Sequence, residues 1–207
     1  LGTPYGGWYF SDKNLSNQIV IISAGVGEDI SFDIEMLNNY RAKLYLIDPT
    51  PRAILYIQKI IDKLGNSRTV PYDESTGNQP IEAYNLSNVK LDDFILIKKA
   101  LYNKSGQTIK FYAPTNKEYV SYSISNFQNN FSKDTDFIEV TTITLEDIVN
   151  ENSILGIDIL KLDIEGAENH TIPVKPITKF QASFEALLKA GLPEKQRINM
   201  LMTWAQT

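Results

Sequence analysis

The feature that most constrains the fold is a strand pattern followed by a helix pattern, which occurs twice in succession near the N-terminus. Residues 18–22 (QIVII) are a short apolar run rich in β-branched side chains, and apolar residues recur at helical spacing over residues 29–40. Residues 43–47 (KLYLI) form a second apolar run, after which Thr50 is typical of a helix N-cap and Gly65 of a helix end. Two such units joined by tight turns predict an α/β fold with a doubly wound, mostly parallel sheet.

Further strands are expected beyond a long polar stretch. Residues 66–91 are rich in Asn, Ser and Asp and predict an irregular excursion. A strand pattern resumes at residues 93–101, a turn follows at residues 103–106, and residues 108–112 are typical of the second arm of a hairpin. This region is therefore predicted to be an inserted β-hairpin.

The last third of the chain gives weaker patterns. Residues 137–143 and 157–162 are apolar strand runs, and Thr144 begins a capping-box pattern for a short helix between them. Helical patterns follow at residues 182–189 and 194–205, without a recognisable strand. We therefore expect an irregular, incomplete C-terminal part that does not extend the sheet.

The absence of cysteine excludes several kinds of chemistry. Without it the chain has no disulfide, no thiol nucleophile and no Cys-ligated zinc or iron–sulfur cluster. The one histidine, His170, cannot build a metal site from two or three imidazoles, and no G-x-S-x-G turn is present to hold the serine of a Ser-His-Asp hydrolase. We predict no metal centre.

Charge and hydropathy argue against a nucleic-acid or membrane partner. The net charge is −5 and the pI is near 5.0, so the field of the whole chain does not attract nucleic acid or anionic membranes. No apolar run approaches the roughly 18–20 residues that span a bilayer, and the N-terminus has no basic-then-apolar signal pattern. We expect a cytoplasmic protein, and nothing in the sequence indicates its oligomeric state.

The first candidate site is the glycine turn SAGVGE at residues 23–28. Glycines allow a backbone to approach a ligand closely, and Asp48, at the end of the next strand run, follows at the distance of an acid that holds an adenosine ribose. Position 30 of the dinucleotide pattern G-x-G-x-x-G is Ile30, and acids follow the turn directly. A cationic ligand such as S-adenosylmethionine therefore suits the turn better than NAD, unless Asp48 only caps the following helix.

The second candidate site is the segment KLDIEGAE at residues 161–168. Asp163 stands at the carboxyl end of a predicted buried strand, and Glu165, Glu168 and His170 follow within seven residues. A carboxylate there could bind an amino group, a proton or a divalent ion such as Mg²⁺. The alternatives are acids that cap a helix and a histidine that lies at the surface.

The N-terminal segment YGGWYF, residues 5–10, is the third candidate. Its aromatic side chains could cover a flat ligand as a lid, or could pack on the edge of the sheet. Residues 119–122 leave the same two interpretations open. We divide the chain of 207 residues, the size of one domain, into an N-terminal aromatic segment (1–18), a cofactor-binding core (19–170) and a helical tail (171–207).

Four blocks together resemble the FkbM family of S-adenosylmethionine-dependent methyltransferases. They are ISAGVGEDIS at 22–31, IDPTP at 47–51, KALYNKSG at 99–106 and LKLDIEGAE at 160–168. They occur in the order of the family, and the opening YGGW is similar to a subset of it. The resemblance implies a Rossmann-like class I methyltransferase fold with S-adenosylmethionine as cofactor. It also implies O-methylation of a hydroxyl on a sugar, glycan or polyketide-like small molecule.

The resemblance also implies roles for individual residues. Gly25 and Gly27 would line the methionine part of the cofactor, and Asp48 would bind the ribose. Ala100 and Leu101 would lie near the adenine.

One position departs from the family pattern. Ser23 replaces an acid that often begins the first motif, so the contact to the cofactor's amino group would come from Asp163 or Glu28. Asp163 would face the transferring methyl group and is the first candidate for orienting the acceptor or removing its proton. Glu165, Glu168 and His170 are the further catalytic candidates. The competing hypotheses are a non-catalytic binding domain that keeps the fold and a nicotinamide-dependent oxidoreductase.

Overall fold

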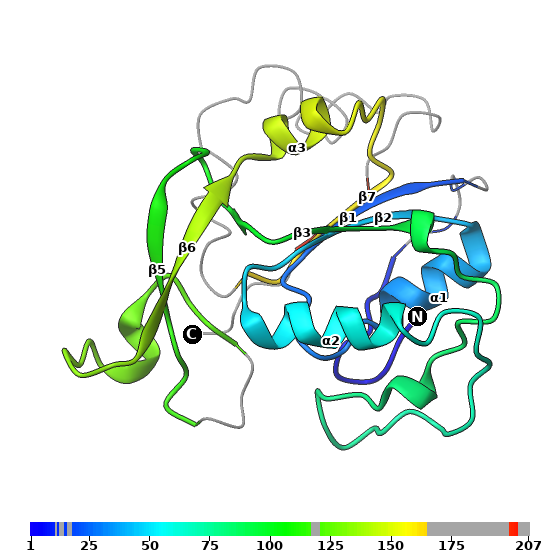
Figure 1. The fold of residues 1–207 in the computed structure, drawn as a ribbon, viewed down its shortest axis with the longest axis horizontal. Helices are drawn as coiled ribbons and strands as arrows, with labels where there is room; N and C mark the ends of the chain where they lie inside the picture. Colours follow the sequence, from blue (N-terminus) through cyan, green and yellow to red (C-terminus); the bar gives the residue numbers. More distant parts are fainter. Residues whose placement is uncertain (11, 13–14, 16–17, 117–120, 165–198, 203–207) are drawn as a thin grey trace.

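A computed structural model describes residues 1–10, 12, 15, 18–116, 121–164 and 199–202 of the chain. Its centre is a parallel five-stranded sheet in the order β3-β2-β1-β7-β8 (Figure 1). The strands are β1 (Val20–Ala24), β2 (Lys43–Ile47), β3 (Phe94–Ile97), β7 (Ile159–Leu162) and β8 (Asn199–Met202). The predicted parallel sheet, characteristic of a Rossmann-like fold, is confirmed.

Helices cover the sheet on both faces. Helices α1 (Ser31–Tyr40) and α2 (Pro51–Ile61) lie on one face, and α3 (Leu145–Glu151) lies beyond the other (Figure 1). Successive side chains of β1 pack on opposite faces of the sheet. Ile21 packs in the cluster with α1 and α2, whereas Ile22 packs in the cluster with α3. This two-sided burial explains why the strand runs are apolar throughout rather than alternating.

The helix caps and ends predicted from the sequence are only partly confirmed. Thr144 accepts a hydrogen bond from the Asp147 N–H at 3.1 Å, so the predicted cap of α3 is confirmed. Thr50 precedes α2 in extended conformation, but its side chain makes no capping hydrogen bond and donates to Asp48 instead. The α2 helix ends at Ile61, four residues before the predicted end.

The second sheet corrects the predicted hairpin. Strands β4 (Ala100–Leu101) and β5 (Thr108–Tyr112) do not pair with each other, because β6 (Phe137–Ile143) lies between them. It pairs parallel with β4 and antiparallel with β5. The turn after β4 is held by β6, since the Thr142 carbonyl accepts the Gly106 N–H at 3.0 Å. Long-range pairing therefore replaces the local hairpin.

The polar excursion is irregular, as predicted, but it is firmly packed. It contains the short 3₁₀ helices η1 (Ile81–Ala83) and η2 (Leu91–Asp93). Tyr84 is buried, and its hydroxyl lies 2.7 Å from that of Tyr56 on α2 and accepts the Ile30 N–H at 3.1 Å. Burial raises the pKa of both phenols, which stay neutral.

The helix predicted within residues 194–205 is wrong at the four residues there that the structure describes. Asn199–Met202 are not helical; they form β8, paired parallel with β7 from Ile159↔Asn199 onward. Met and Leu favour helices locally, but pairing with the edge of β7 decides the conformation. The helical pattern at 182–189 lies outside the described residues. In the described part of the chain, no helix is long and apolar enough to span a bilayer.

Candidate active site at the carboxyl ends of the strands

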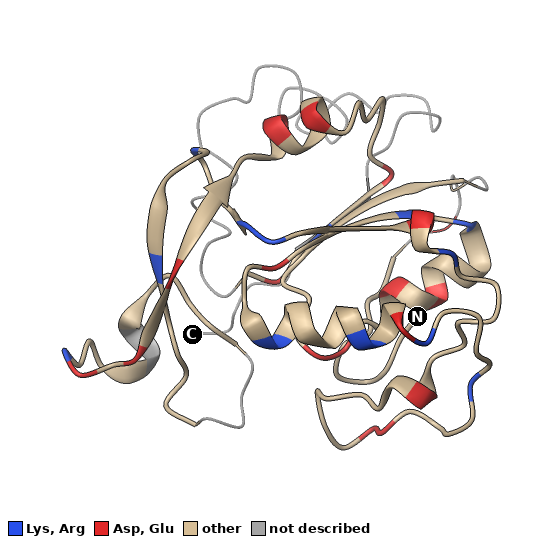
Figure 2. Cartoon of the chain, in the orientation of Figure 1, with Lys and Arg blue, Asp and Glu red and all other residues tan. Residues whose placement is uncertain are grey.

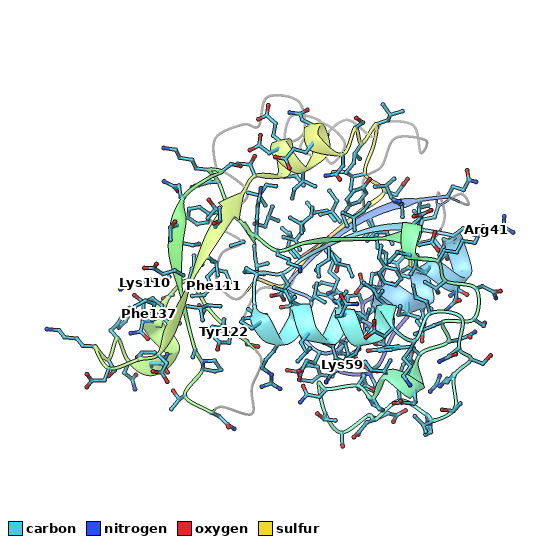
Figure 3. The ribbon with its side chains drawn as sticks, viewed as in Figure 1. Arg41, Lys59, Lys110, Phe111, Tyr122 and Phe137 are labelled. Carbon is cyan, nitrogen blue, oxygen red and sulfur yellow. The ribbon has the colours of Figure 1, made fainter. Side chains whose placement is uncertain are left out.

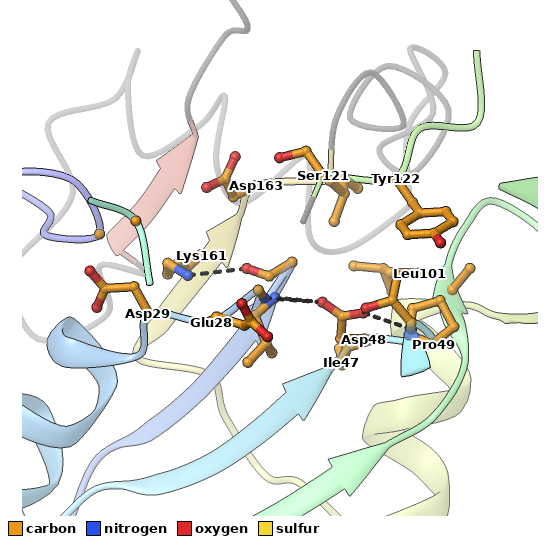
Figure 4. A pocket seen from close by; sticks show the side chains of 18 of the residues that line it. Glu28, Asp29, Ile47, Asp48, Pro49, Leu101, Ser121, Tyr122, Lys161 and Asp163 are labelled. Carbon is orange, nitrogen blue, oxygen red and sulfur yellow. Dashed lines mark hydrogen bonds between the residues drawn. The ribbon is translucent and has the colours of Figure 1, made fainter. Parts of the chain in front are cut away.

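A pocket lies where the strand order reverses. The chain passes from β1 to β2 and β3 on one side and later places β7 on the other side of β1. Ligands of open α/β sheets bind at the carboxyl ends of the strands at such a point. Here a pocket that opens to solvent is lined by the turns after β1 and β2 and by the end of β7 (Figure 4). Acidic segments gather at this end of the sheet (Figure 2).

Seven of the predicted site residues line this pocket together. They are Gly25, Gly27, Glu28, Asp48, Ala100, Leu101 and Asp163. Ser23 is fully buried and does not belong to the lining. Glu165, Glu168 and His170 lie outside the described residues. The structure thus brings together residues that are up to 138 positions apart in sequence, from Gly25 to Asp163.

The glycine turn is shaped by its neighbour strand. Gly25 has a φ of +80°, and a Cβ atom built on it would lie 1.7 Å from the Asp163 carbonyl oxygen. Gly27 also adopts a positive φ, of +57°. Glycine is required at position 25 because the turn after β1 passes directly against the end of β7.

Asp48 anchors the same turn. Its Oδ2 accepts the N–H groups of Val26 at 2.9 Å and Gly27 at 3.2 Å. Its Oδ1 accepts the Thr50 N–H at 2.8 Å and the Thr50 hydroxyl at 2.6 Å. These four bonds fill the acceptor sites of the carboxylate. Asp48 therefore ties the glycine turn to the start of α2.

Glu28 makes a second link to α2. Arg52 Nη2 lies 2.6 Å from Glu28 Oε2, and Arg52 Nε donates to Oε1 at 3.3 Å. This fork-like pair holds the Glu28 carboxylate at the rim of the pocket.

The N-terminal segment forms one wall. The Thr3 hydroxyl donates to Asp29 Oδ2 at 2.6 Å, and the Thr3 N–H donates to Ser31 Oγ at 2.9 Å. The segment is therefore fixed to the start of α1, and Tyr5 and Trp8 line the pocket. Trp8 also packs against the core beside α1, so the wall combines features of the two predicted alternatives.

Aromatic side chains of the second sheet form the opposite wall. Ala100 and Leu101 of β4 are buried at its base, and Phe111 of β5 and Tyr122 line it further out. Figure 3 shows Tyr122 beside the beginning of α2, within reach of the first sheet. Sequence reasoning did not assign Phe111 to the site, because its approach depends on β6.

A buried lysine lies beneath the glycine turn. Lys161 is 3% exposed and pairs in register with Ser23, so both side chains point toward α1. Lys161 Nζ donates to the Gly25 carbonyl at 3.4 Å (Figure 4). It also donates to Ser23 Oγ at 3.4 Å and lies 3.9 Å from Asp33 Oδ2. Sequence reasoning placed Lys161 at the beginning of the second candidate segment but gave it no role, although a lysine inside an apolar strand run is unusual.

Asp33 on α1 is the counter-charge of this lysine. It is completely buried, and neither carboxylate oxygen has a hydrogen-bond partner. Burial raises the pKa of Asp33, and Lys161 opposes the shift. Among the ionisable side chains at the described part of the site, Asp33 and Lys161 are the least exposed to solvent.

Asp163 is the one predicted catalytic residue that the structure describes. It is exposed in the pocket, and its backbone N–H is bonded to the Ala24 carbonyl at 2.9 Å, directly before Gly25. In the described ranges, no group of three acidic or histidine side chains is placed to hold a metal ion.

The comparison with protein families decides the classification. The model of the methyltransferase FkbM domain matches residues 12–202, which is most of the chain. The chain belongs to the FkbM methyltransferase family. The resemblance drawn from the four sequence blocks is thereby confirmed, and a methyltransferase is the activity that the family supports. No curated protein and no solved structure matches the chain significantly.

Proposed function

We propose that this FkbM domain is an S-adenosylmethionine-dependent O-methyltransferase acting on a hydroxyl of a sugar, glycan or polyketide-like small molecule. The observation that carries the proposal is the convergence of the glycine turn, Asp48 and Asp163 on one pocket at the reversal of the strand order. The pocket lies where an open α/β sheet binds its ligand, as expected for a methyltransferase that binds a methyl donor.

The residues present fit the methyl donor. The turn at Gly25 and Gly27 offers close backbone approach for the methionine part, and the buried side chains of Ala100 and Leu101 offer an apolar floor for the adenine. Asp48 lies between these two regions but has no spare acceptor site. A ribose hydroxyl would therefore take the place of the Thr50 hydroxyl on Oδ1, the bond that a side-chain rotation can release.

The donor supplies an electrophilic methyl group, and the chain must position the acceptor oxygen in line with it. Asp163 is the carboxylate on the solvent side of the pocket. It would orient the acceptor hydroxyl and accept its proton as the sulfur–methyl bond of the donor breaks and the oxygen–methyl bond forms, which leaves S-adenosylhomocysteine. Glu165, Glu168 and His170 remain further candidates for this role. Because orientation supplies much of the rate, a strong base is not required.

Two competing functions predict different binding. A nicotinamide-dependent oxidoreductase is disfavoured because Ile30 stands where the third glycine would be, and Glu28 and Asp29 would repel a pyrophosphate. The replacement of an acid by Ser23 and the weak sequence patterns of the C-terminal part favour a non-catalytic binding domain. Ser23 does not line the pocket, so its change removes no group from the wall.

The test is isothermal titration of the purified chain with S-adenosylhomocysteine and, in parallel, with NADH. Micromolar binding of the first ligand alone is expected. Binding of NADH alone would support the oxidoreductase, and binding of neither would support a domain without cofactor. A methyl-transfer assay on a panel of hydroxylated acceptors then separates an enzyme from a cofactor-binding domain.

The variant Asp163→Asn sharpens this assay. We expect turnover to fall by about 10²- to 10⁴-fold while S-adenosylhomocysteine affinity stays within a few fold. Unchanged turnover would remove Asp163 from the reaction and direct attention to Glu165, Glu168 and His170.

A further inference from the structure

Lys161 stands apart from the other charged side chains of the pocket. Among the described residues that line it, Lys161 is the only lysine or arginine, whereas four acids line it: Glu28, Asp29, Asp48 and Asp163. Most of these acids already have donors. Glu28 has Arg52, and Asp29 has the Thr3 hydroxyl and the Ser31 N–H. The lysine is thus the only lining side chain in the described part whose positive charge can pair with an anionic group.

The ammonium of Lys161 is held, but only by long contacts. Its distances to Ser23 Oγ and to the Gly25 carbonyl are both 3.4 Å, and its distance to Asp33 Oδ2 is 3.9 Å. Charge-assisted hydrogen bonds of an ammonium are normally about 2.7–2.9 Å long. A buried ammonium with three donors therefore has capacity for a short, anionic acceptor.

Asp33 does not fully neutralise this charge. Its two oxygens make no hydrogen bond, and burial favours its protonated form. The face of Trp8 lies 5.6 Å from Nζ and adds a weak attraction without accepting a hydrogen bond. Because Lys161 lines the pocket beside the glycine turn, its positive charge acts on any group that occupies the pocket there.

We infer that Lys161 binds the α-carboxylate of the methyl donor and so fixes the direction in which the donor lies in the pocket. This inference rests on the proposed function. Nζ touches the carbonyl of Gly25, the first glycine of the turn over which the methionine part would lie. With the carboxylate at Lys161 and the ribose near Asp48, the two ends of the donor are distinguished by charge. An anionic group on the acceptor is the other source of the same chemistry.

The test compares two ligands that differ only in this carboxylate. S-adenosylmethionine and its decarboxylated analogue are titrated calorimetrically into the whole chain and into the double variant Lys161→Met/Asp33→Asn. The wild-type chain should bind the carboxylated ligand about 10- to 100-fold more tightly, the range of a charge-assisted hydrogen bond. The double variant should bind the two ligands with nearly equal affinity.

The double variant is chosen because Lys161→Met alone would leave a buried carboxylate without its counter-charge. Thermal melting shows whether each protein is folded. Lys161→Arg should keep part of the preference, since it keeps the charge. Lys59→Met is the matched control, because Lys59 is an exposed cation on α2 that does not line the pocket. It should leave the ratio of the two affinities unchanged.

Each result decides something. A wild-type ratio near one, or a double variant that keeps the wild-type ratio, overturns the inference while the proposed function stands. Loss of turnover only with acidic acceptors, at an unchanged donor ratio, reassigns Lys161 to the acceptor and also overturns it. If the wild-type chain binds neither ligand, the proposed function itself fails.

Discussion

The carbonyl oxygen of Asp163 lies where a side chain on Gly25 would have to be: a Cβ atom there would approach it to 1.7 Å. The turn after β1 and the end of β7 are therefore packed backbone against backbone. β1 and β7 pair along their length up to Ala24 and Leu162, and this backbone contact continues one residue further, to the residue that carries the proposed catalytic carboxylate. Placement of Asp163 thus depends on a residue without a side chain.

Replacing Gly25 by alanine should unfold or strongly destabilise the chain. The clash is with backbone, which cannot move aside, and φ is +80°. We expect a loss of more than about 3 kcal/mol in unfolding free energy, measured by chemical denaturation. Gly106→Ala is the matched control: φ is +73° but nothing lies within 4 Å of the new Cβ. It should cost only about 1–2 kcal/mol, and equal losses would show that the clash does not matter.

Asp48→Ala should reduce both donor affinity and stability. The backbone N–H groups of Val26, Gly27 and Thr50 lose their acceptor, and the glycine turn loses its link to α2. Affinity for S-adenosylhomocysteine should weaken by about 1–3 kcal/mol. Calorimetry on the folded variant measures this. An unchanged affinity would sink the assignment of Asp48 to the ribose.

Asp33 should make the stability of the chain depend on pH above 3.8. Burial raises its pKa above 3.8 in the folded chain, so the native state holds its proton more tightly than the unfolded state. Its contribution to stability is then full below pH 3.8 and is lost as pH rises through the raised value. Asp33→Asn should lack this loss. Denaturation midpoints of both proteins at a series of pH values measure it, and parallel curves would contradict the prediction.

Thr3→Val should loosen the N-terminal wall. The Thr3 hydroxyl donates to Asp29 and accepts the Gly6 N–H at 2.8 Å, so the variant leaves two polar partners unpaired. We expect a loss of about 1–3 kcal/mol and faster amide exchange over residues 1–10. Tyr9→Ala, at a fully exposed side chain, should change neither. Exchange that stays slow in the valine variant would show that other contacts hold the segment.

The sequence indicates the central sheet because its signals are local. The apolar runs that become β1 and β2, and the turns after them, can be recognised without knowledge of any partner. The pairing of β6 between β4 and β5, and of Asn199–Met202 with β7, depends on residues far away in the chain. At Asn199–Met202 the local sequence even favours a helix.

The site follows the same division. Asp48 and Asp163 could be selected because acids at strand ends mark the binding edge of a parallel sheet. That the acceptor sites of Asp48 are already filled could not be predicted, because two of its hydrogen bonds come from the backbone N–H groups of Val26 and Gly27. Lys161 acquires its significance only when α1 brings Asp33 beneath the sheet.

The hydroxyl of Tyr84 affects which molecules can compete for the pocket. It accepts the Ile30 N–H, while Asp29 accepts the Ser31 N–H at 2.8 Å. The N–H groups of Ile30 and Ser31, at the beginning of α1, are thus already paired inside the chain, whereas in many nucleotide-binding folds such groups bind a phosphate. These N–H groups are therefore not available to bind the phosphates of abundant nucleotides. An adenosine compound without phosphate meets little competition from such nucleotides for the pocket.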